Sequence, residues 1–511
     1  MFQRLTNPEQ LEAERQRIAK LFGTHAEWFC TLSDGNTHAL RNRELDIQLN
    51  RGRLVLSCWT ERGTQSWRIK ASNWTGEKLQ LHQWRRTGSN IPVIELVPRA
   101  AATAIAATIR AARLDRCVQL AELACTLQPG VRPERVSLSP GIRRGQPGRY
   151  ARIILRLRQH RIAVTGLVAS KITSETDPFL SAALLWFTRI SERAAPPLIE
   201  QLWLLAEKEM AKPLAYRVAL LRKGLREAIK IYEIDETWSQ LTEMTAPRLS
   251  DLWTKRLKQF PPVPEPLNCT LINAIKAKAP DAIDVVDARQ GQTVRYFGLP
   301  FARVRQVMDT THLWFGLQGS SRVLLDDKTK DQWDTLVNDL RQHRSAAAPD
   351  HRHALYRTAG EAWLESLLRR DISKLDPGLI VAPLHAQFRT SRGGRKGVRP
   401  IDLLALRLDG RLVVIELKVF EDREHVLQGA DYWQRVEAHR RRGHISQAKL
   451  FGDRQIRDES PLVYLVAPTL RVHPAFQILA RSITPEIEIY RFDINEDWRS
   501  GVRVMRRMRV N

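Results

Sequence analysis

Residues 398–419 read VRPIDLLALRLDGRLVVIELKV. Two apolar runs flank Asp409-Gly410, a dipeptide that is a strong signal for the turn of a β-hairpin. A two-residue turn would place Asp402 and Glu416 on opposite faces of the hairpin. A three-residue loop with a left-handed glycine pairs Asp402 directly with Glu416 on one face.

Lys418 lies two residues beyond Glu416 and shares its face, on strands that are otherwise almost entirely apolar. Burying such charges is costly unless they pair or bind a cation. A hard divalent cation, Mg²⁺ or Mn²⁺, prefers carboxylate oxygens such as those of Asp402 and Glu416 and keeps several waters, one of which can attack a phosphodiester. Lys418 would orient that water, help to deprotonate it or stabilise charge on the phosphorane. The alternative interpretation is a structural salt-bridge cluster.

A predicted helix over residues 360–371 offers a third acid upstream of the hairpin. It places three leucines on one face and Glu361 and Glu365 together on another, four residues apart. Glu365 lies deeper in the helix and is the preferred candidate for a metal ligand, with Glu361 as its nearest rival. The alternative interpretation is that Glu365 is an ordinary helix residue that faces solvent.

Two further features flank the hairpin. Residues 389–399, RTSRGGRKGVR, form a basic loop suited to contacting phosphates. A predicted helix over 426–439 presents Gln428 and Tyr432 one turn apart, near the expected metal face. Either a structural or a functional role fits these two side chains.

These residues together resemble the PD-(D/E)XK nuclease superfamily, and within it the NucS-like and RecB-like endonuclease domains. The resemblance covers roughly residues 355–470 and rests on Glu365, Asp402, Glu416-Leu417-Lys418 and Gln428. It implies that Asp402, Glu416 and Glu365 form the metal site, that Lys418 is catalytic and that Gln428 supports the site. It also implies a restriction-endonuclease-like mixed sheet flanked by helices, with DNA rather than RNA as the substrate.

The whole chain is strongly basic, with 81 Lys and Arg against 56 Asp and Glu and a formal net charge of +25 over 511 residues. Such an excess attracts polyanions, of which nucleic acid is the commonest. The sequence has no signal-peptide pattern and no apolar stretch of the ~18 residues that a membrane span needs. We therefore expect a cytoplasmic protein with a nucleic-acid partner and no membrane partner, and a homo-oligomer is compatible with the sequence.

Pattern and composition predict an α/β protein of several α+β domains. Residues 1–128 are predicted to form a strand-rich module with helices, 148–258 an α/β module, 267–346 a small strand-rich module and 351–511 the nuclease-like domain. The proline-rich segments 129–147 and 261–266 are predicted to be linkers. No glycine-rich nucleotide-binding motif occurs in the α/β module, and no internal repeat period stands out.

The predicted function is metal-dependent hydrolysis of phosphodiester bonds by the C-terminal domain, while the other modules grip or select the nucleic acid. One alternative is a catalytically inactive nucleic-acid-binding or assembly protein that retains the nuclease fold. Another is a protein-interaction scaffold. Near the N-terminus, Trp59, Trp67, Trp74 and Trp84 alternate with basic residues, which predicts either a base-stacking surface or, more commonly, the core of a small sheet.

Overall fold

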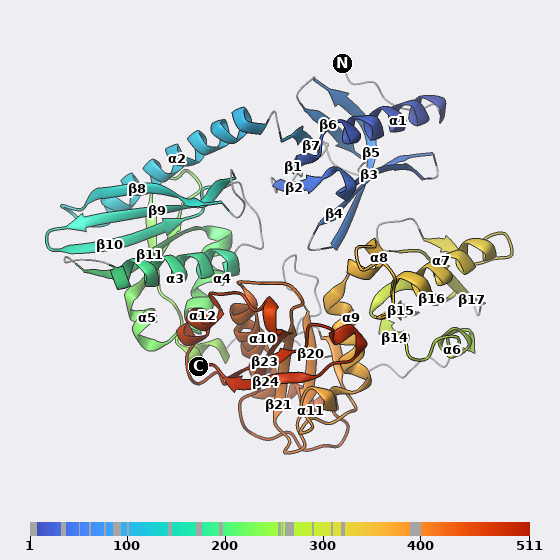
Figure 1. The fold of residues 1–511 in the computed structure, drawn as a ribbon. Helices are drawn as coiled ribbons and strands as arrows, with labels where there is room; N and C mark the ends of the chain where they lie inside the picture. The colour runs from blue at the N-terminus through green and yellow to red at the C-terminus, as the bar shows by residue number, and fades with distance from the viewer. Residues whose placement is uncertain are drawn as a thin grey trace. The chain divides into compact units, whose positions relative to one another are not determined.

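The computed structural model describes residues 8–31, 37–50, 52–60, 63–75, 78–84, 93–99, 102–141, 146–169, 176–193, 198–253, 257, 259–260, 270–288, 291–307, 310–317, 322–388 and 400–511. The chain divides into two compact units (Figure 1), one mainly of residues 1–109 and 266–362, the other mainly of 110–169, 173–265 and 363–511. Helices and sheets occur in both units, which confirms the mixed α/β class. No helix in the described segments is long and apolar enough to cross a membrane.

The first unit opens with helix α1 (Pro8–Thr24) and an antiparallel sheet of strand order β2-β1-β7-β6-β5-β4-β3. The strands are β1 (Glu27–Thr31), β2 (Thr37–Arg41), β3 (Leu45–Leu49), β4 (Leu54–Thr60), β5 (Gly63–Trp74), β6 (Leu79–Gln83) and β7 (Val93–Pro98), with a short 3-10 helix at Asn42–Glu44. The alternating pattern from β3 to β7 produces the predicted meander. α1 packs on this sheet through Leu11, Ile18 and Phe22.

The burial of individual side chains tests two predictions for this sheet, the end of the first helix and the environment of the tryptophans. The sequence pattern predicts one helix over residues 8–30, but α1 ends at Thr24, because Trp28 and Cys30 alternate into the core as strand residues. Trp67 and Trp74 pack against the core, as the more common interpretation predicted. Trp84 is 47% exposed, and the Arg53 guanidinium lies 5.1 Å from its ring centroid.

The same unit contains a second antiparallel sheet, of order β14-β15-β16-β17-β18. Its elements are α6 (Thr270–Ala277), β14 (Ile283–Ala288), β15 (Gly291–Tyr296), β16 (Leu299–Val307), β17 (Thr310–Phe315), β18 (Val323–Leu324), α7 (Lys330–His343) and α8 (Ala354–Arg357). The sequence pattern predicts one strand over 294–299, but Phe297 and Gly298, with φ angles of 41° and 75°, make the tight turn between β15 and β16 there.

The second unit begins with a mixed sheet of order β13-β12-β11-β10-β9-β8. Its elements are α2 (Ala102–Thr126), β8 (Arg132–Pro140), β9 (Pro147–Leu157), β10 (His160–Gly166), α3 (Thr176–Arg193), β11 (Ile199–Glu207), α4 (Lys208–Val218), α5 (Lys223–Ala228), β12 (Ile229–Ile234), β13 (Leu241–Met244) and a 3-10 helix at Leu249–Trp253. β10, β11 and β12 are parallel, and the other pairs are antiparallel. The sequence pattern predicts a strand over 201–206, a helix over 213–222 and a strand over 228–233, and β11, α4 and β12 confirm this strand–helix–strand unit.

The predicted linker at 129–147 is wrong, because Arg132–Pro140 is strand β8. Its two prolines are tolerated because β8 is the edge of its sheet, where a missing backbone donor can face outward. Helix α2 packs on this sheet through Cys117, Leu120 and Ala124. From Arg110 onward it therefore belongs to the second unit, whereas the sequence placed it in the module 1–128.

The second unit ends in another mixed sheet, of order β19-β20-β21-β22-β23-β24. Its elements are α9 (Gly360–Arg370), β19 (His385–Phe388), β20 (Ile401–Leu406), β21 (Leu412–Leu417), α10 (His425–Arg440), α11 (His444–Gln447), β22 (Leu462–Pro468), α12 (Phe476–Ser482), β23 (Ile489–Ile494) and β24 (Val504–Arg509), with 3-10 helices at Ile372–Lys374, Thr469–Arg471 and Trp498–Ser500. β21, β22 and β23 are parallel, and the outer pairs are antiparallel.

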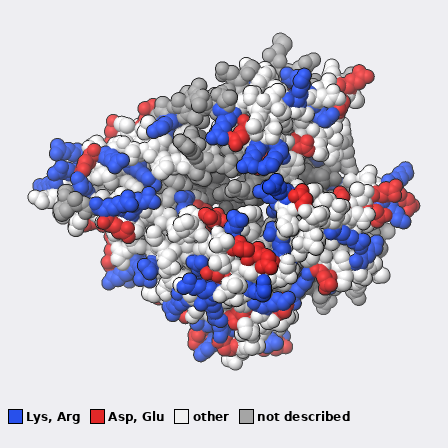
Figure 2. All heavy atoms as spheres, in the orientation of Figure 1, with Lys and Arg blue, Asp and Glu red and all other residues white. Residues whose placement is uncertain are grey.

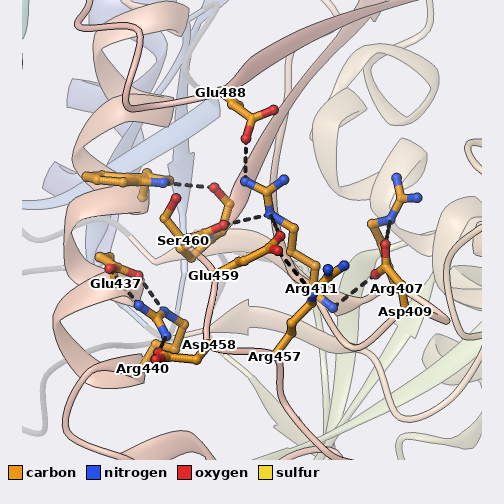
Figure 3. Close-up of polar contacts among 12 residues, drawn as sticks. Arg407, Asp409, Arg411, Glu437, Arg440, Arg457, Asp458, Glu459, Ser460 and Glu488 are labelled. Carbon is orange, nitrogen blue, oxygen red and sulfur yellow. Dashed lines mark hydrogen bonds and ion pairs between the residues drawn. The ribbon is translucent and has the colours of Figure 1, made fainter.

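The turn between β20 and β21 is the predicted three-residue loop. Arg407 and Gly410 close it through backbone hydrogen bonds of 2.9 Å, from the Arg407 N–H to the Arg411 carbonyl and from the Gly410 N–H to the Arg407 carbonyl. Gly410 has a φ of +85°, the left-handed conformation that a glycine adopts without strain. At this end Arg411 donates to Glu488 at 2.6 Å and to the Ser460 carbonyl at 2.8 Å (Figure 3), which fixes the turn against the sheet.

Candidate metal-dependent active site

The hairpin register places Asp402 and Glu416 side by side. Leu403 pairs with Ile415 and Leu406 with Leu412, so the next pair outward is Asp402 with Glu416. Directly opposed residues of an antiparallel pair share a face and lie about 5 Å apart at their Cβ atoms. The two acids therefore stand together, as the three-residue loop predicted.

Lys418 provides the positive charge of this cluster. Its Nζ lies 2.7 Å from Glu416 Oε1 and 3.7 Å from Asp422 Oδ2, and the Lys418 side chain is only 8% exposed. Glu416 is 2% exposed. Charges buried so deeply favour close pairing, and the ammonium here occupies a position beside the carboxylate that a metal cation would also favour.

Asp402 is held at the strand end by the backbone of its partner. The Leu417 N–H donates to Asp402 Oδ2 at 2.9 Å. Burial raises the pKa of Asp402 well above its usual value, and the negative charge of Glu416 raises it further. Lys418 and the Leu417 hydrogen bond act in the opposite direction without cancelling the rise. Burial and Glu416 therefore favour the neutral form of Asp402 in the absence of a further cation.

Glu365 joins this cluster from α9 and is 1% exposed. Gln387, on β19, connects it to Asp402: the Gln387 Nε2 donates to Glu365 Oε2 at 2.8 Å and to Asp402 Oδ1 at 3.4 Å. Glu361, the rival, lies in the first turn of α9 and is only partly buried. Of the two helix acids, Glu365 is thus the one that reaches Asp402 through a shared amide.

Helix α10 covers the same face of the sheet. Tyr432 packs in the apolar cluster with Leu404 and Val414, and burial followed by the charge of Glu416 raises the pKa of its hydroxyl. Gln428, one turn earlier, is 4% exposed, and its Oε1 has no hydrogen-bond partner among the described residues. A buried amide oxygen is costly without a donor, so this position suits accepting a hydrogen bond from a ligand or a water.

Three side chains at the site were not predicted from the sequence: Gln387, Asp422 and His425. The His425 Nε2 donates to the Glu416 carbonyl at 3.2 Å, and burial, then Lys418, lowers the His425 pKa to about 4, which keeps the ring neutral. Asp422 lies four residues after Lys418, a spacing that was visible in the sequence. Gln387 has a φ of +48° and carried no comparable signal. The predicted basic loop 389–399 lies outside the described residues.

The donor set fits a hard divalent cation. Among the described residues no three His, Cys, Asp or Glu side chains form a ready-made metal centre. Mg²⁺ does not need one, because it usually binds through one or two carboxylates and keeps waters or substrate phosphates as its other ligands. Asp402 and Glu416 would supply those carboxylates, and a cation between them would lower the pKa of Asp402, which burial and then the charge of Glu416 raise.

Comparison of the chain with models of known protein families, with curated proteins and with solved structures found no match. The argument for function therefore rests on the site itself.

His385, at the start of β19, gives this domain a predicted pH dependence. Its Nε2 lies 2.6 Å from the Leu450 carbonyl, and burial lowers its pKa below the ordinary value, an effect that this hydrogen bond only partly opposes. As the pH falls below the unfolded-state pKa of about 6.5, the unfolded chain takes up a proton first and stability falls. We expect a wild-type urea midpoint that decreases from pH 7.5 to pH 5.5 more steeply than that of His385→Gln. Parallel decreases in the two proteins would contradict this assignment.

Proposed function

We propose that the C-terminal domain is a metal-dependent nuclease that hydrolyses phosphodiester bonds of nucleic acid, with DNA as the preferred substrate. The observation that carries the proposal is the position of Asp402 beside Glu416, one residue beyond the Leu403–Ile415 pair, with Lys418 Nζ 2.7 Å from Glu416 Oε1. These are the groups that phosphodiester hydrolysis needs: acids for a cation, and an ammonium for the attacking water or the charge on phosphorus.

Each of these residues would have its own role in the reaction. Asp402 and Glu416 would hold Mg²⁺ or Mn²⁺, and Glu365 would contribute through Gln387 and water. A bound cation supplies charge stabilisation at a phosphate and lowers the pKa of a coordinated water. Lys418 would orient the attacking water and balance negative charge, and Gln428 would accept a hydrogen bond through its buried Oε1. The net charge of +25 supports a polyanionic substrate.

Cleavage of end-labelled single- and double-stranded DNA tests this proposal directly. The wild type is expected to cut in Mg²⁺ or Mn²⁺ and not in EDTA. Glu416→Ala is expected to be inactive, because it removes one of two metal-holding carboxylates. Glu459→Ala is a matched control: Glu459 lies in the same domain, at the turn end of the hairpin beside Arg411 and Arg457 (Figure 3), and should leave cleavage unchanged. Metal-independent cutting, or equal cutting by Glu416→Ala, would overturn the proposal. Absence of cutting together with tight binding would favour the inactive nucleic-acid-binding protein.

A further inference from the structure

The two sheets of the second unit have the same topology. In each, two antiparallel pairings are followed by two parallel pairings and a final antiparallel one: β8-β9-β10-β11-β12-β13 in the first sheet and β19-β20-β21-β22-β23-β24 in the second. The connecting helices also correspond, since α3 and α4 stand where α10 and α12 stand, and α2 precedes the first sheet as α9 precedes the second.

The strand registers make the correspondence specific to single residues. In the first sheet, the parallel pairing of β10 with β11 ends with Gly166 opposite Leu205. In the second sheet, the parallel pairing of β21 with β22 ends with Leu417 opposite Val466. Thr165 and Glu416 each lie one residue before that last pair, so they occupy equivalent positions in the two sheets. The next parallel pair of strands has Leu202 opposite Ile229 in the first sheet and Val463 opposite Ile489 in the second. These four residues share one hydrophobic core, so the same faces correspond.

The two copies pack against each other through those equivalent faces. α3 and α4 share a core with α10 and α12. Leu221, after α4, forms an antiparallel bridge with Ile483, after α12. The Arg222 N–H donates to the Ser482 carbonyl and the Thr484 N–H to the Leu220 carbonyl, both at 2.9 Å. Such reciprocal contacts are typical of the two-fold symmetric interface of a homodimer, here formed within one chain.

At the positions that correspond to Asp402, Glu416 and Lys418, the first copy has no acid. Arg152 stands at the place of Asp402, Thr165 at that of Glu416 and Leu167 at that of Lys418. The Thr165 hydroxyl is buried and donates to the Ala151 carbonyl at 2.7 Å. These side chains offer no carboxylate to a metal ion.

Arginines occupy this position instead. Arg152 is partly buried, and its guanidinium lies 5.8 Å from the ring centroid of Trp186 on α3. Burial, then the charges of Arg189 and Arg423, lowers the pKa of Arg152, so these two arginines each lie close enough to repel Arg152. No carboxylate of the described residues forms an ion pair with Arg152. An anion such as a phosphate would relieve this repulsion.

Arg423 connects the arginine cluster (Arg152, Arg189 and Arg423) to the acidic site. It directly follows Asp422, whose carboxylate lies 3.7 Å from Lys418 Nζ. Arg423 also pairs with Glu424 at 3.2 Å and donates to the Pro178 carbonyl of α3 at 3.4 Å. A strand bound at the cluster would therefore lie next to the loop that borders the acidic site.

The surface around the cluster is also basic. Strands β8, β9 and β10 carry Arg132, Arg135, Arg149, Arg152, Arg156 and Arg161, and Glu134 is their only acid. Figure 2 shows Lys and Arg gathered over these strands on the face in view.

We propose that residues 110–253 are a second copy of the C-terminal fold that lacks a metal site and binds the phosphate backbone of nucleic acid through the arginine cluster. The nature of the ligand rests on the proposed function, whereas the correspondence of the two copies does not. Each chain would then hold its substrate with one copy and act on it with the other.

Fluorescence anisotropy with a labelled 20-base-pair DNA duplex in EDTA tests this proposal without any cleavage. Arg189→Gln and Arg152→Gln are each expected to weaken binding about fivefold to tenfold at 0.1 M salt and to lower the slope of log K against log salt by about one, the signature of one lost phosphate contact. Arg152→Lys should retain the slope. Arg156→Gln is the comparison variant, on the same strand and face but about 13 Å away, and it should weaken binding less than either cluster variant.

The outcomes separate this proposal from the proposed function. If Arg189→Gln and Arg152→Gln bind DNA with wild-type affinity and slope, the proposed role of the arginine cluster in binding is wrong, even if the wild type cuts DNA. An equal loss in Arg156→Gln would also overturn it, because binding would then be spread over the whole basic face. A loss confined to the cluster variants supports the proposal even if no cleavage is found. Arg189 is exposed, so its replacement should not disturb folding.

Discussion

Lys418→Ala is expected to lower the rate of metal-dependent DNA cleavage about a hundredfold to a thousandfold, the usual effect of losing one preorganised group that stabilises transition-state charge. Lys418 Nζ lies 2.7 Å from Glu416 Oε1, and its side chain is 8% exposed, so a water molecule cannot easily replace it. The rate should be measured in single-turnover experiments at saturating Mg²⁺, so that binding and chemistry are separated.

The same substitution should change stability in a metal-dependent way. Without Lys418, Glu416 is left as a buried charge at 2% exposure, which costs about 3–5 kcal/mol of unfolding free energy in EDTA. Mg²⁺ should recover part of that loss by taking the place of the ammonium. Lys449→Ala is the control: Lys449 pairs with Asp453 at 3.0 Å, but both side chains are more than 70% exposed, so neither cleavage nor stability should change appreciably. Wild-type rates in Lys418→Ala would remove Lys418 from the chemistry.

The candidate site was largely predictable because its residues lie on regular elements. An Asp-Gly turn fixes the hairpin register, and the register fixes which side chains share a face, so Asp402, Glu416 and Lys418 follow from local sequence. Glu365 follows from helical spacing. The position of Gln387 could not be predicted in this way, since it depends on a left-handed backbone (φ +48°) and on the pairing of β19 with β20.

The internal duplication could not be predicted from a repeat period, and the structure gives the reason. Corresponding residues are 250 apart at Arg152 and Asp402 but 262 apart at Leu221 and Ile483, because the connections differ in length. No constant period survives such changes. β8 was also hidden, because its prolines resemble those of a linker until the strand is seen at a sheet edge.

Arg217→Met is expected to destabilise the second unit by about 3–5 kcal/mol, because it removes the cation that pairs with Asp177 and leaves Asp431, among the described residues, with Arg435 alone, at 3.1 Å. Arg217 on α4 donates to Asp177 on α3 at 2.6 Å and also to Asp431 on α10, and all three side chains are 16–18% exposed. Burial lowers the pKa of Arg217, but Asp431 and Asp177 more than offset this effect and raise it, so the guanidinium stays charged. The pair with Asp431 joins the two copies of the fold.

Urea unfolding of the full chain, followed by far-UV circular dichroism, measures this effect. Lys223→Met is the control, since Lys223 lies at 3.9 Å from Glu227 with 82% of its side chain exposed, and its loss should cost less than about 0.5 kcal/mol. A double-mutant cycle of Arg217→Met with Asp431→Asn tests the coupling between the copies, because the double variant removes both partners of the ion pair that joins them. We expect the double variant to be more stable than the sum of the single losses predicts. Strict additivity would mean that this ion pair does not couple the two copies, and their association would then depend on the shared apolar core and the backbone bridge at Leu221 and Ile483.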